Sequence, residues 1–394
     1  MNLNLFSNIW KLYVIKASKW LMLFMPTIFL FFKENGLELH DIMVIQAIYS
    51  ISIALIEIPS GYIADVLGRK KSMIIGTLFG FIGMLIYTFA SGFWGFLPAA
   101  LCLGIGQSFI SGSDTALMYD SLVAANMKEK FIKFEGRSIA LGNFAEAIAF
   151  IVGGFLAEIS LRTPFYYQSV IAFIGLFVAF LLIEPPVSKL GNKKPWTNIK
   201  YIIKYSLVDN IPLKWNIIYS SVIGATTLVM AWFAQPYYAA LNMEVKYYGI
   251  IGAVLNLAVA FTSFYAHRIE EKIDTNKLLI FILIGLCFCY AFLGSFLNYW
   301  GLAILFLFYL IRGIATPVLR DFINRFTPSE MRATVMSIRS FMIRVIFAIF
   351  SPFLGYVADV YSIQTAFNIS AIVFFVIGLV SLIFYLKNEK IRLE

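Results

Sequence analysis

Eight ionisable side chains lie inside stretches of sequence that are otherwise apolar. Charges in such a setting are costly, and they mark either a self-neutralising pair or a route for an ion or polar solute. The first half of the chain contributes the acids, and the bases of the second half are all arginines. We expect some of these groups to meet across a central cavity, where their carboxylates bind and release protons because a low-dielectric setting opposes the charged form. The eight are Lys16, Lys19, Glu57, Asp114, Glu146, Arg312, Arg339 and Arg344.

A plainer interpretation exists for the two lysines. Long lysine side chains near the end of a span can extend their ammonium groups to the membrane surface. Lys16 and Lys19 then need no function, and Glu57 pairs permanently with one of them. For Asp114, Glu146 and Arg344 the pathway interpretation is preferred.

The elements that hold these residues are predicted to be transmembrane helices, which makes the chain an all-α membrane protein. Hydrophobic residues make up 60% of the chain and charged residues 13%, whereas a soluble domain carries about 25% charge. One helical crossing takes about 20 apolar residues, so the length suits about a dozen crossings. The predicted spans cover residues 11–32, 41–60, 72–92, 95–122, 137–158, 165–184, 213–239, 247–267, 278–297, 299–323, 334–358 and 365–386.

Basic residues gather on one side of the predicted membrane. The loops of that side hold most of them, from Lys11 to Arg392, whereas the other side has only Lys33, Arg162 and Lys246. The positive-inside rule therefore places both termini and the central linker in the cytoplasm of a multi-pass protein of the cell (inner) membrane. The net charge of +9 is a topology signal on this interpretation, and no nucleic-acid partner is expected.

The two halves of the chain repeat each other. At one constant offset, residues 111–120 align with 312–321, and residues 154–158 align with 355–359. Two repeated halves are typical of transporter folds. The sequence predicts an N-terminal six-helix bundle at 1–186, a cytoplasmic linker at 187–211 and a C-terminal six-helix bundle at 212–394.

A short loop after the second predicted span carries the most specific motif. It reads Gly61-Tyr-Ile-Ala-Asp65-Val-Leu-Gly68-Arg69-Lys70-Lys71. In this position it resembles the signature loop of the major facilitator superfamily, G-x-x-x-D-x-x-G-[RK]-x-[RK]. Three stretches also resemble bacterial drug and small-molecule exporters of that family, at residues 57–61, 111–120 and 332–334. The resemblance implies twelve transmembrane helices in two pseudo-symmetric six-helix bundles that rock around a central site.

The same resemblance implies a latch on the cytoplasmic side. In the family the aspartate of the loop, here Asp65, faces the start of helix eleven. The arginine, here Arg69, reaches an acid at the end of helix four, a place that Asp120 occupies. The alternative is that the basic residues of the loop only determine topology.

The glycines and Lys70 complete the expected gate. Gly61 and Gly68 allow close backbone approach and unusual φ values where the chain turns. The second copy of the loop, at residues 267–274, has lost its glycines. We therefore expect a gate built on one intact copy.

In the family, spans one, four, seven and ten line the cavity, which implies four candidate substrate contacts besides Asp114. An interfacial aromatic belt accounts equally well for the tyrosines among them. The four are Ser111, Gln235, Tyr237 and Tyr238.

Together these features favour proton-coupled export of a small organic substrate across the lipid bilayer, by a monomer that uses alternating access. Uptake by symport and a non-transporting membrane sensor or scaffold remain alternatives. The pair Gly153-Gly154 keeps part of an exporter motif, and it also suits close helix packing. The sequence holds no nucleotide loop, metal-ligand cluster or catalytic triad, so we expect no enzyme activity, no metal and no cofactor.

Overall fold

A computed structural model describes residues 3–186, 195–328 and 331–393, and within these residues the secondary structure is helical without strands. Twelve of the described segments are long and apolar enough to cross a membrane, which confirms the predicted all-α membrane fold. The helices are α1 (Leu3–Phe6), α2 (Asn8–Trp20), α3 (Ile28–Glu34), α4 (Leu39–Leu67), α5 (Arg69–Phe89), α6 (Gly92–Ile110), α7 (Ser113–Ala124), α8 (Phe131–Ile159), α9 (Thr163–Phe180), α10 (Pro195–Lys204), α11 (Ile211–Ala240), α12 (Val245–Lys272), α13 (Thr275–Ser295), α14 (Trp300–Arg325), α15 (Arg332–Val360) and α16 (Ile363–Leu393).

Two of the twelve spans are interrupted. The first stops at Trp20 and resumes at Ile28, after a 3-10 turn that contains Pro26. The fourth breaks between α6 and α7, where Gly112 has a φ of +77° that favours glycine. Interrupted spans are tolerated where other groups satisfy the exposed backbone, and in transporters they often border binding sites.

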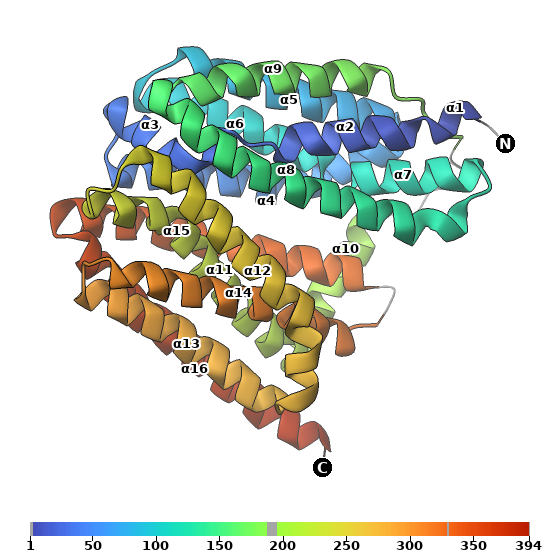
Figure 1. The fold of residues 1–394 in the computed structure, drawn as a ribbon. Helices are drawn as coiled ribbons and strands as arrows, with labels where there is room; N and C mark the ends of the chain where they lie inside the picture. Colours follow the sequence, from blue (N-terminus) through green and yellow to red (C-terminus); the bar gives the residue numbers. More distant parts are fainter. Residues whose placement is uncertain (1–2, 187–194, 329–330, 394) are drawn as a thin grey trace. The chain divides into compact units, whose positions relative to one another are not determined.

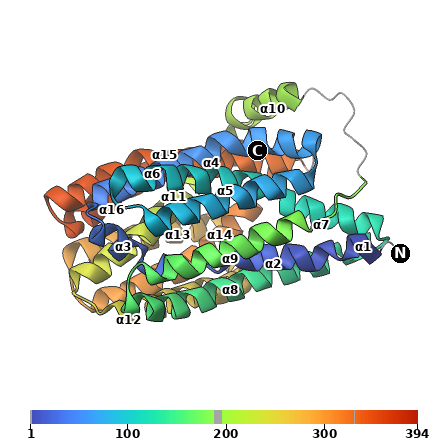
Figure 2. The ribbon, with the colours of Figure 1, turned by 90° about the horizontal axis from the view of Figure 1, so that it is seen from above.

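The chain divides into two compact units. Unit 1 comprises Met1–Leu37, Ile48–Asn192 and Glu244–Ala253. Within it, α2 packs against α8 and α9, and α5 packs against α6 (Figures 1 and 2). The contact between α5 and α6 is close because glycines face each other. A Cβ added at Gly106 would lie 2.7 Å from the carbonyl oxygen of Gly76.

Unit 2 comprises Glu38–Ala47, Lys193–Met243 and Val254–Glu394. Here α11 packs against α15 and α16, and α13 runs beside α16 (Figure 1). Buried tyrosines join α11 to α13. The hydroxyl of Tyr219 donates to the carbonyl of Leu279 at 2.7 Å, and that of Tyr290 donates to the carbonyl of Thr226 at 2.8 Å.

The units differ from a simple cut at the linker because the first turns of α4 and α12 are exchanged. The backbone N–H groups of Leu39 and His40 donate to the two carboxylate oxygens of Asp359 at 3.1 and 2.7 Å, which ties the start of α4 to α15. The start of α12 joins α8, since a Cβ added at Gly249 would lie 2.3 Å from the carbonyl oxygen of Phe150.

The glycine pair of α8 serves this close packing. A Cβ added at Gly153 would lie 2.0 Å from the carbonyl oxygen of Leu23, and one at Gly154 would lie 3.2 Å from the Cα of Gly249. Both positions therefore require glycine for contact between helices.

The central linker is described from Pro195, where α10 begins, and the expected linker residues 187–194 lie outside the described part of the chain.

Candidate functional site

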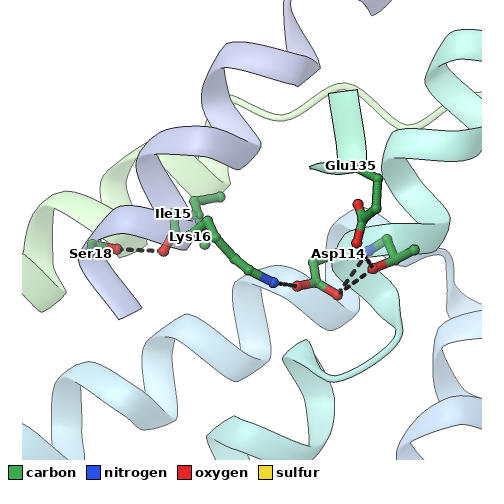
Figure 3. Close-up of polar contacts among 6 residues, drawn as sticks. Ile15, Lys16, Ser18, Asp114 and Glu135 are labelled. Carbon is green, nitrogen blue, oxygen red and sulfur yellow. Dashed lines mark hydrogen bonds and ion pairs between the residues drawn. The ribbon is translucent and has the colours of Figure 1, made fainter. Parts of the chain in front are cut away.

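The centre of the candidate site in unit 1 is an ion pair between α2 and α7. The ammonium nitrogen of Lys16 lies 3.2 Å from a carboxylate oxygen of Asp114, and each side chain is 18% exposed. Figure 3 shows the two side chains reaching toward one another from their helices. From the sequence, Lys16 was expected to extend to the membrane surface, and some of the buried charges were expected to meet across the central cavity. In this structure Lys16 pairs with Asp114 of the same unit instead of extending to the surface, and a meeting of charges across the cavity stays a prediction.

A hydroxyl links this pair to a second carboxylate. Thr115 donates its backbone N–H to Asp114 at 2.8 Å and its hydroxyl to Glu135 of α8 at 3.2 Å. Glu135 was not singled out from the sequence, because it lies near the start of its helix among charged neighbours. Thr115 thus links the two carboxylates, and Lys16 forms its ion pair with Asp114, so the cluster contains one paired acid and a second acid bound through a hydroxyl.

Lys19 lies one turn after Lys16 and borders the same cluster. It lines a space of about 10 Å³ together with Asp114, Glu135 and Ser138. That volume is about the minimum that holds one water molecule. The Lys19 ammonium makes no hydrogen bond or ion pair among the described residues.

The other two acids of the first half are placed apart. Glu57 lies partly exposed in α4, and its carboxylate contacts no described partner. Glu146 lies partly buried in α8. Neither belongs to the Lys16–Asp114 cluster.

The arginines of the second half lie in unit 2. Arg339 of α15 is buried and donates from Nε to the hydroxyl of Ser220. Arg312 of α14 lies over the ring of Tyr309, with 5.3 Å between the guanidinium carbon and the ring centroid. The Nε atom of Arg344 is buried without a hydrogen-bond partner among the described atoms. These three cations make no ion pair with a described carboxylate.

The signature loop contains the ion pair expected from the sequence. Nε of Arg69 lies 2.8 Å from a carboxylate oxygen of Asp120, which joins the start of α5 to α7. Both side chains are about one-fifth exposed, at 22% and 18%. The side chain of Asp65 lies outside the described part of the structure.

A third acid completes the loop, and sequence reasoning missed it. Glu184, just after α9, accepts the backbone N–H groups of Arg69 and Lys70 at 2.8 Å each. It therefore caps α5 at the end where the helix dipole favours an anion. The glycine before the helix makes room for it, since Gly68 has a φ of +102° and a Cβ there would lie 2.9 Å from the Glu184 carboxyl.

The other signature glycine behaves differently from the expectation. Gly61 lies inside α4 with helical backbone, and no described atom lies within 4 Å of a Cβ built there. The expected tight approach at Gly61 is therefore wrong for this structure, because the turn comes only at Gly68.

The second copy of the loop keeps a charged contact with its polarity reversed. Arg325 at the end of α14 pairs with Glu270 of α12 and, with 2.6 Å between its Nε and the carboxylate oxygen, with Asp321. Asp274, in the place of the second glycine, caps α13 by accepting from the N–H groups of Asn276 and Lys277. The expected loss of this copy applies to its glycines and not to its ion pair.

Of the four candidate substrate contacts, two are partly buried and two are buried. Ser111 ends α6 at the break in span four, and Gln235 is partly buried in α11. Tyr238 is buried. Tyr237 is fully buried, and its hydroxyl donates to the carbonyls of Asn298 and Phe296 at 2.7 and 3.2 Å. The polar atom of Tyr237 is thus engaged in the α13–α14 connection, and a substrate contact of this residue stays a prediction.

The geometry agrees with comparisons to known proteins. The model of the Major Facilitator Superfamily matches residues 19–316 and 217–393. The chain belongs to the major facilitator superfamily. It is therefore a multi-pass membrane protein of a transporter family rather than an enzyme.

Two relatives illustrate the range of this likeness. An uncharacterised MFS-type transporter of Methanocaldococcus jannaschii is 22% identical over 372 residues and covers 93% of both chains. The quinolone resistance protein NorA of Staphylococcus aureus is 24% identical over 164 residues, which are 42% of this chain and 41% of that protein.

Solved structures share the fold across nearly the whole chain. A point mutant of the nucleoside transporter NupG has a TM-score of 0.83 at 15% identity, and the match covers 96% of this chain and 99% of that one. A D-xylose–proton symporter has a TM-score of 0.73 at 14% identity, with 98% and 97% covered. At these identities the likeness describes the fold.

Proposed function

We propose that this chain is a secondary active transporter that exports a small organic solute by alternating access, in exchange for protons. The observation that carries the coupling is the Lys16–Asp114 ion pair, whose partners are each 18% exposed. Protonation of Asp114 removes the charge that holds Lys16, so the pair can open when a proton binds and close when it leaves. A carboxylate at this depth is a natural proton carrier in a transporter.

The proposal also gives the direction of transport, which is export from the cell. It is supported by the partial likeness to a quinolone resistance protein. The glycine pair of α8 lends no separate support, because helix packing accounts for Gly153 and Gly154. The distribution of basic residues supports a cell-membrane location with cytoplasmic termini.

Proteoliposomes test coupling and direction together. Purified protein is reconstituted, a ligand found by thermal-shift screening is loaded on either side, and flux is measured with and without a pH gradient. We expect flux away from the cytoplasmic face that depends on an opposing proton gradient. Flux in the same direction as protons would instead identify a symporter, and no flux for any bound ligand would favour a sensor.

Substitution of the acids tests the residues. Asp114→Asn, Glu57→Gln and Glu146→Gln each remove one candidate proton carrier, and Asp209→Asn removes an exposed acid outside the spans as the matched control. We expect Asp114→Asn to abolish the pH dependence of flux and the control to leave it intact. Unchanged pH dependence in all three would end the proton-relay idea.

A further inference from the structure

Unit 1 contains a larger, mostly apolar cavity beside the Lys16–Asp114 cluster. Its volume is about 150 Å³, and α2, α5, α6 and α9 contribute its walls. Side chains such as Phe81, Met84 and Leu103 line it. A cavity of about 150 Å³ with apolar walls is large enough to hold a benzene ring.

The break in span one forms one wall of this cavity. Met22 and Phe24 line it from the non-helical segment. The side-chain amide of Gln168 spans the break, because its oxygen accepts the N–H of Leu23 at 3.0 Å and its nitrogen donates to the carbonyl of Ser18 at 3.5 Å. Gln168 thus satisfies the opened backbone, and its hydrogen bonds are already made.

Two polar groups on the wall lack partners. The ammonium of Lys19 and the amide of Gln107 both line the cavity, and neither side chain makes a hydrogen bond within the described part of the chain. The hydroxyls of Ser18 and Thr77, by contrast, donate to carbonyls of their own helices. Asp114, which lines the neighbouring small space together with Lys19, makes its ion pair with Lys16. Lys19 therefore brings to the edge of an apolar cavity an ammonium group that makes no hydrogen bond with a described residue, while the carboxylates of Asp114 and Glu135 line the small space beside it.

Unit 2, taken by itself, also contains cations that make no ion pair with a described residue. Arg312, Arg339 and Arg344 lie in its spans without an ion pair to a described carboxylate. Unpaired charges within a membrane are expensive and are found where a substrate or ion supplies the opposite charge.

We propose that the cavity of unit 1 binds an organic anion of about the size of benzoate. The apolar ring occupies the space beside Phe81, Met84 and Leu103, and the carboxylate accepts hydrogen bonds from Lys19 Nζ and the Gln107 amide. This inference rests on the proposed transport function in one respect, since it assigns the chemical class of the solute.

Binding to the purified full-length protein in detergent tests the site directly. Isothermal titration calorimetry is performed with benzoate, with neutral benzamide and with cationic benzylamine. We expect benzoate to bind at least about tenfold more tightly than either of the others, because a charge-assisted hydrogen bond is about twice as strong as a neutral one. Equal binding of benzoate and benzamide would overturn the proposal.

Variants locate the binding. Lys19→Gln should weaken benzoate by about tenfold or more and leave benzamide unchanged, whereas Lys19→Arg should restore the preference for the anion. Lys11→Gln is the matched control, because Lys11 lies on the same helix outside the cavity and donates to Ser7. A loss in Lys11→Gln equal to that in Lys19→Gln would mean a nonspecific charge effect and contradict the site.

A size variant separates the cavity from the charge. Gly80 lines the cavity, and no described atom lies within 4 Å of a Cβ built there, so the Cβ of Gly80→Leu has room and the larger side chain reduces the space beside it. It should abolish binding of both benzoate and benzamide while the thermal midpoint without ligand is kept. Retained benzoate binding in Gly80→Leu would place the anion elsewhere.

The same preparations distinguish this proposal from the transport function. Proton-driven flux of another solute without benzoate binding contradicts the anion site alone. Benzoate binding that follows the expected variants, without flux of benzoate or of any solute, contradicts the transport function and leaves the site supported.

Discussion

The Lys16–Asp114 ion pair makes an asymmetric prediction about stability. At an effective dielectric constant of about 20, charges 3.2 Å apart attract by about 5 kcal/mol. Desolvation offsets much of this, and removing one partner of a fully buried pair costs about 3–5 kcal/mol. Since both side chains are 18% exposed, we expect a smaller cost, of about 2–3 kcal/mol, for Asp114→Asn.

The opposite substitution should cost less because of Lys19. Asp114→Asn removes the acid that pairs with Lys16 and leaves two ammonium groups, Lys16 and Lys19, with only Glu135 as an acid lining the same small space. Lys16→Gln leaves Asp114 with Lys19 still lining that space, so Lys19 can replace the lost partner. We therefore expect Lys16→Gln to cost about 1 kcal/mol, and the double variant to cost no more than Asp114→Asn alone.

Equilibrium unfolding in mixed detergent micelles measures these three free energies, with Lys11→Gln as a control that should change stability by less than about 0.5 kcal/mol. The double-mutant cycle should give a coupling energy of at least about 1 kcal/mol. The reasoning fails if Lys16→Gln is as destabilising as Asp114→Asn, or if the two effects simply add.

Three further substitutions test other contacts. Gly68→Ala should lower the free energy of unfolding by about 1–2 kcal/mol, because its φ is +102° and its Cβ would press on the Glu184 carboxyl; a denaturant titration equal to wild type would contradict this. Gln168→Leu should cost about 1–3 kcal/mol by leaving the Leu23 N–H unsatisfied beside the break in span one, and hydrogen exchange should show faster exchange at that amide, whereas unchanged protection speaks against the brace. Tyr237→Phe should lower the thermal midpoint without altering solute affinity, because its hydroxyl holds backbone carbonyls; a selective loss of affinity at unchanged stability would return Tyr237 to the substrate site.

Periodicity and motif spacing predicted what depends on neighbours in sequence. The twelve spans follow from long apolar runs. The ion pair between Arg69 and Asp120 could be predicted because the family motif indicates which residue the arginine of the loop contacts. Pairs that form only through space had no such signal. Glu184 and Gln168 each look like an ordinary residue near or within a span, and their roles appear only when α9 packs beside α5 and α2.

The interruption of span one shows the same limit. A proline such as Pro26 favours a kink at its own position, but the segment from Leu21 to Phe24 leaves the helix earlier, at a place with no proline or glycine. Its backbone is satisfied by a side chain from another helix, which local propensity cannot register. For Lys16, a span-end position suggested the membrane surface, and only the fold shows Asp114 within reach.

The reversed ion pair of unit 2 has a consequence for how the two halves diverge. In unit 1 the base, Arg69, lies on the helix that follows the loop, whereas in unit 2 the acid, Glu270, lies before the loop and the base, Arg325, ends another helix. Each copy therefore keeps a pair of opposite charges near its loop, while the residues that carry the charges differ. Among relatives, positions 270 and 325 should therefore vary together, each free to change sign provided that the other changes with it. A sequence motif derived from the first loop therefore does not match the second loop, although the second loop still has an ion pair beside it.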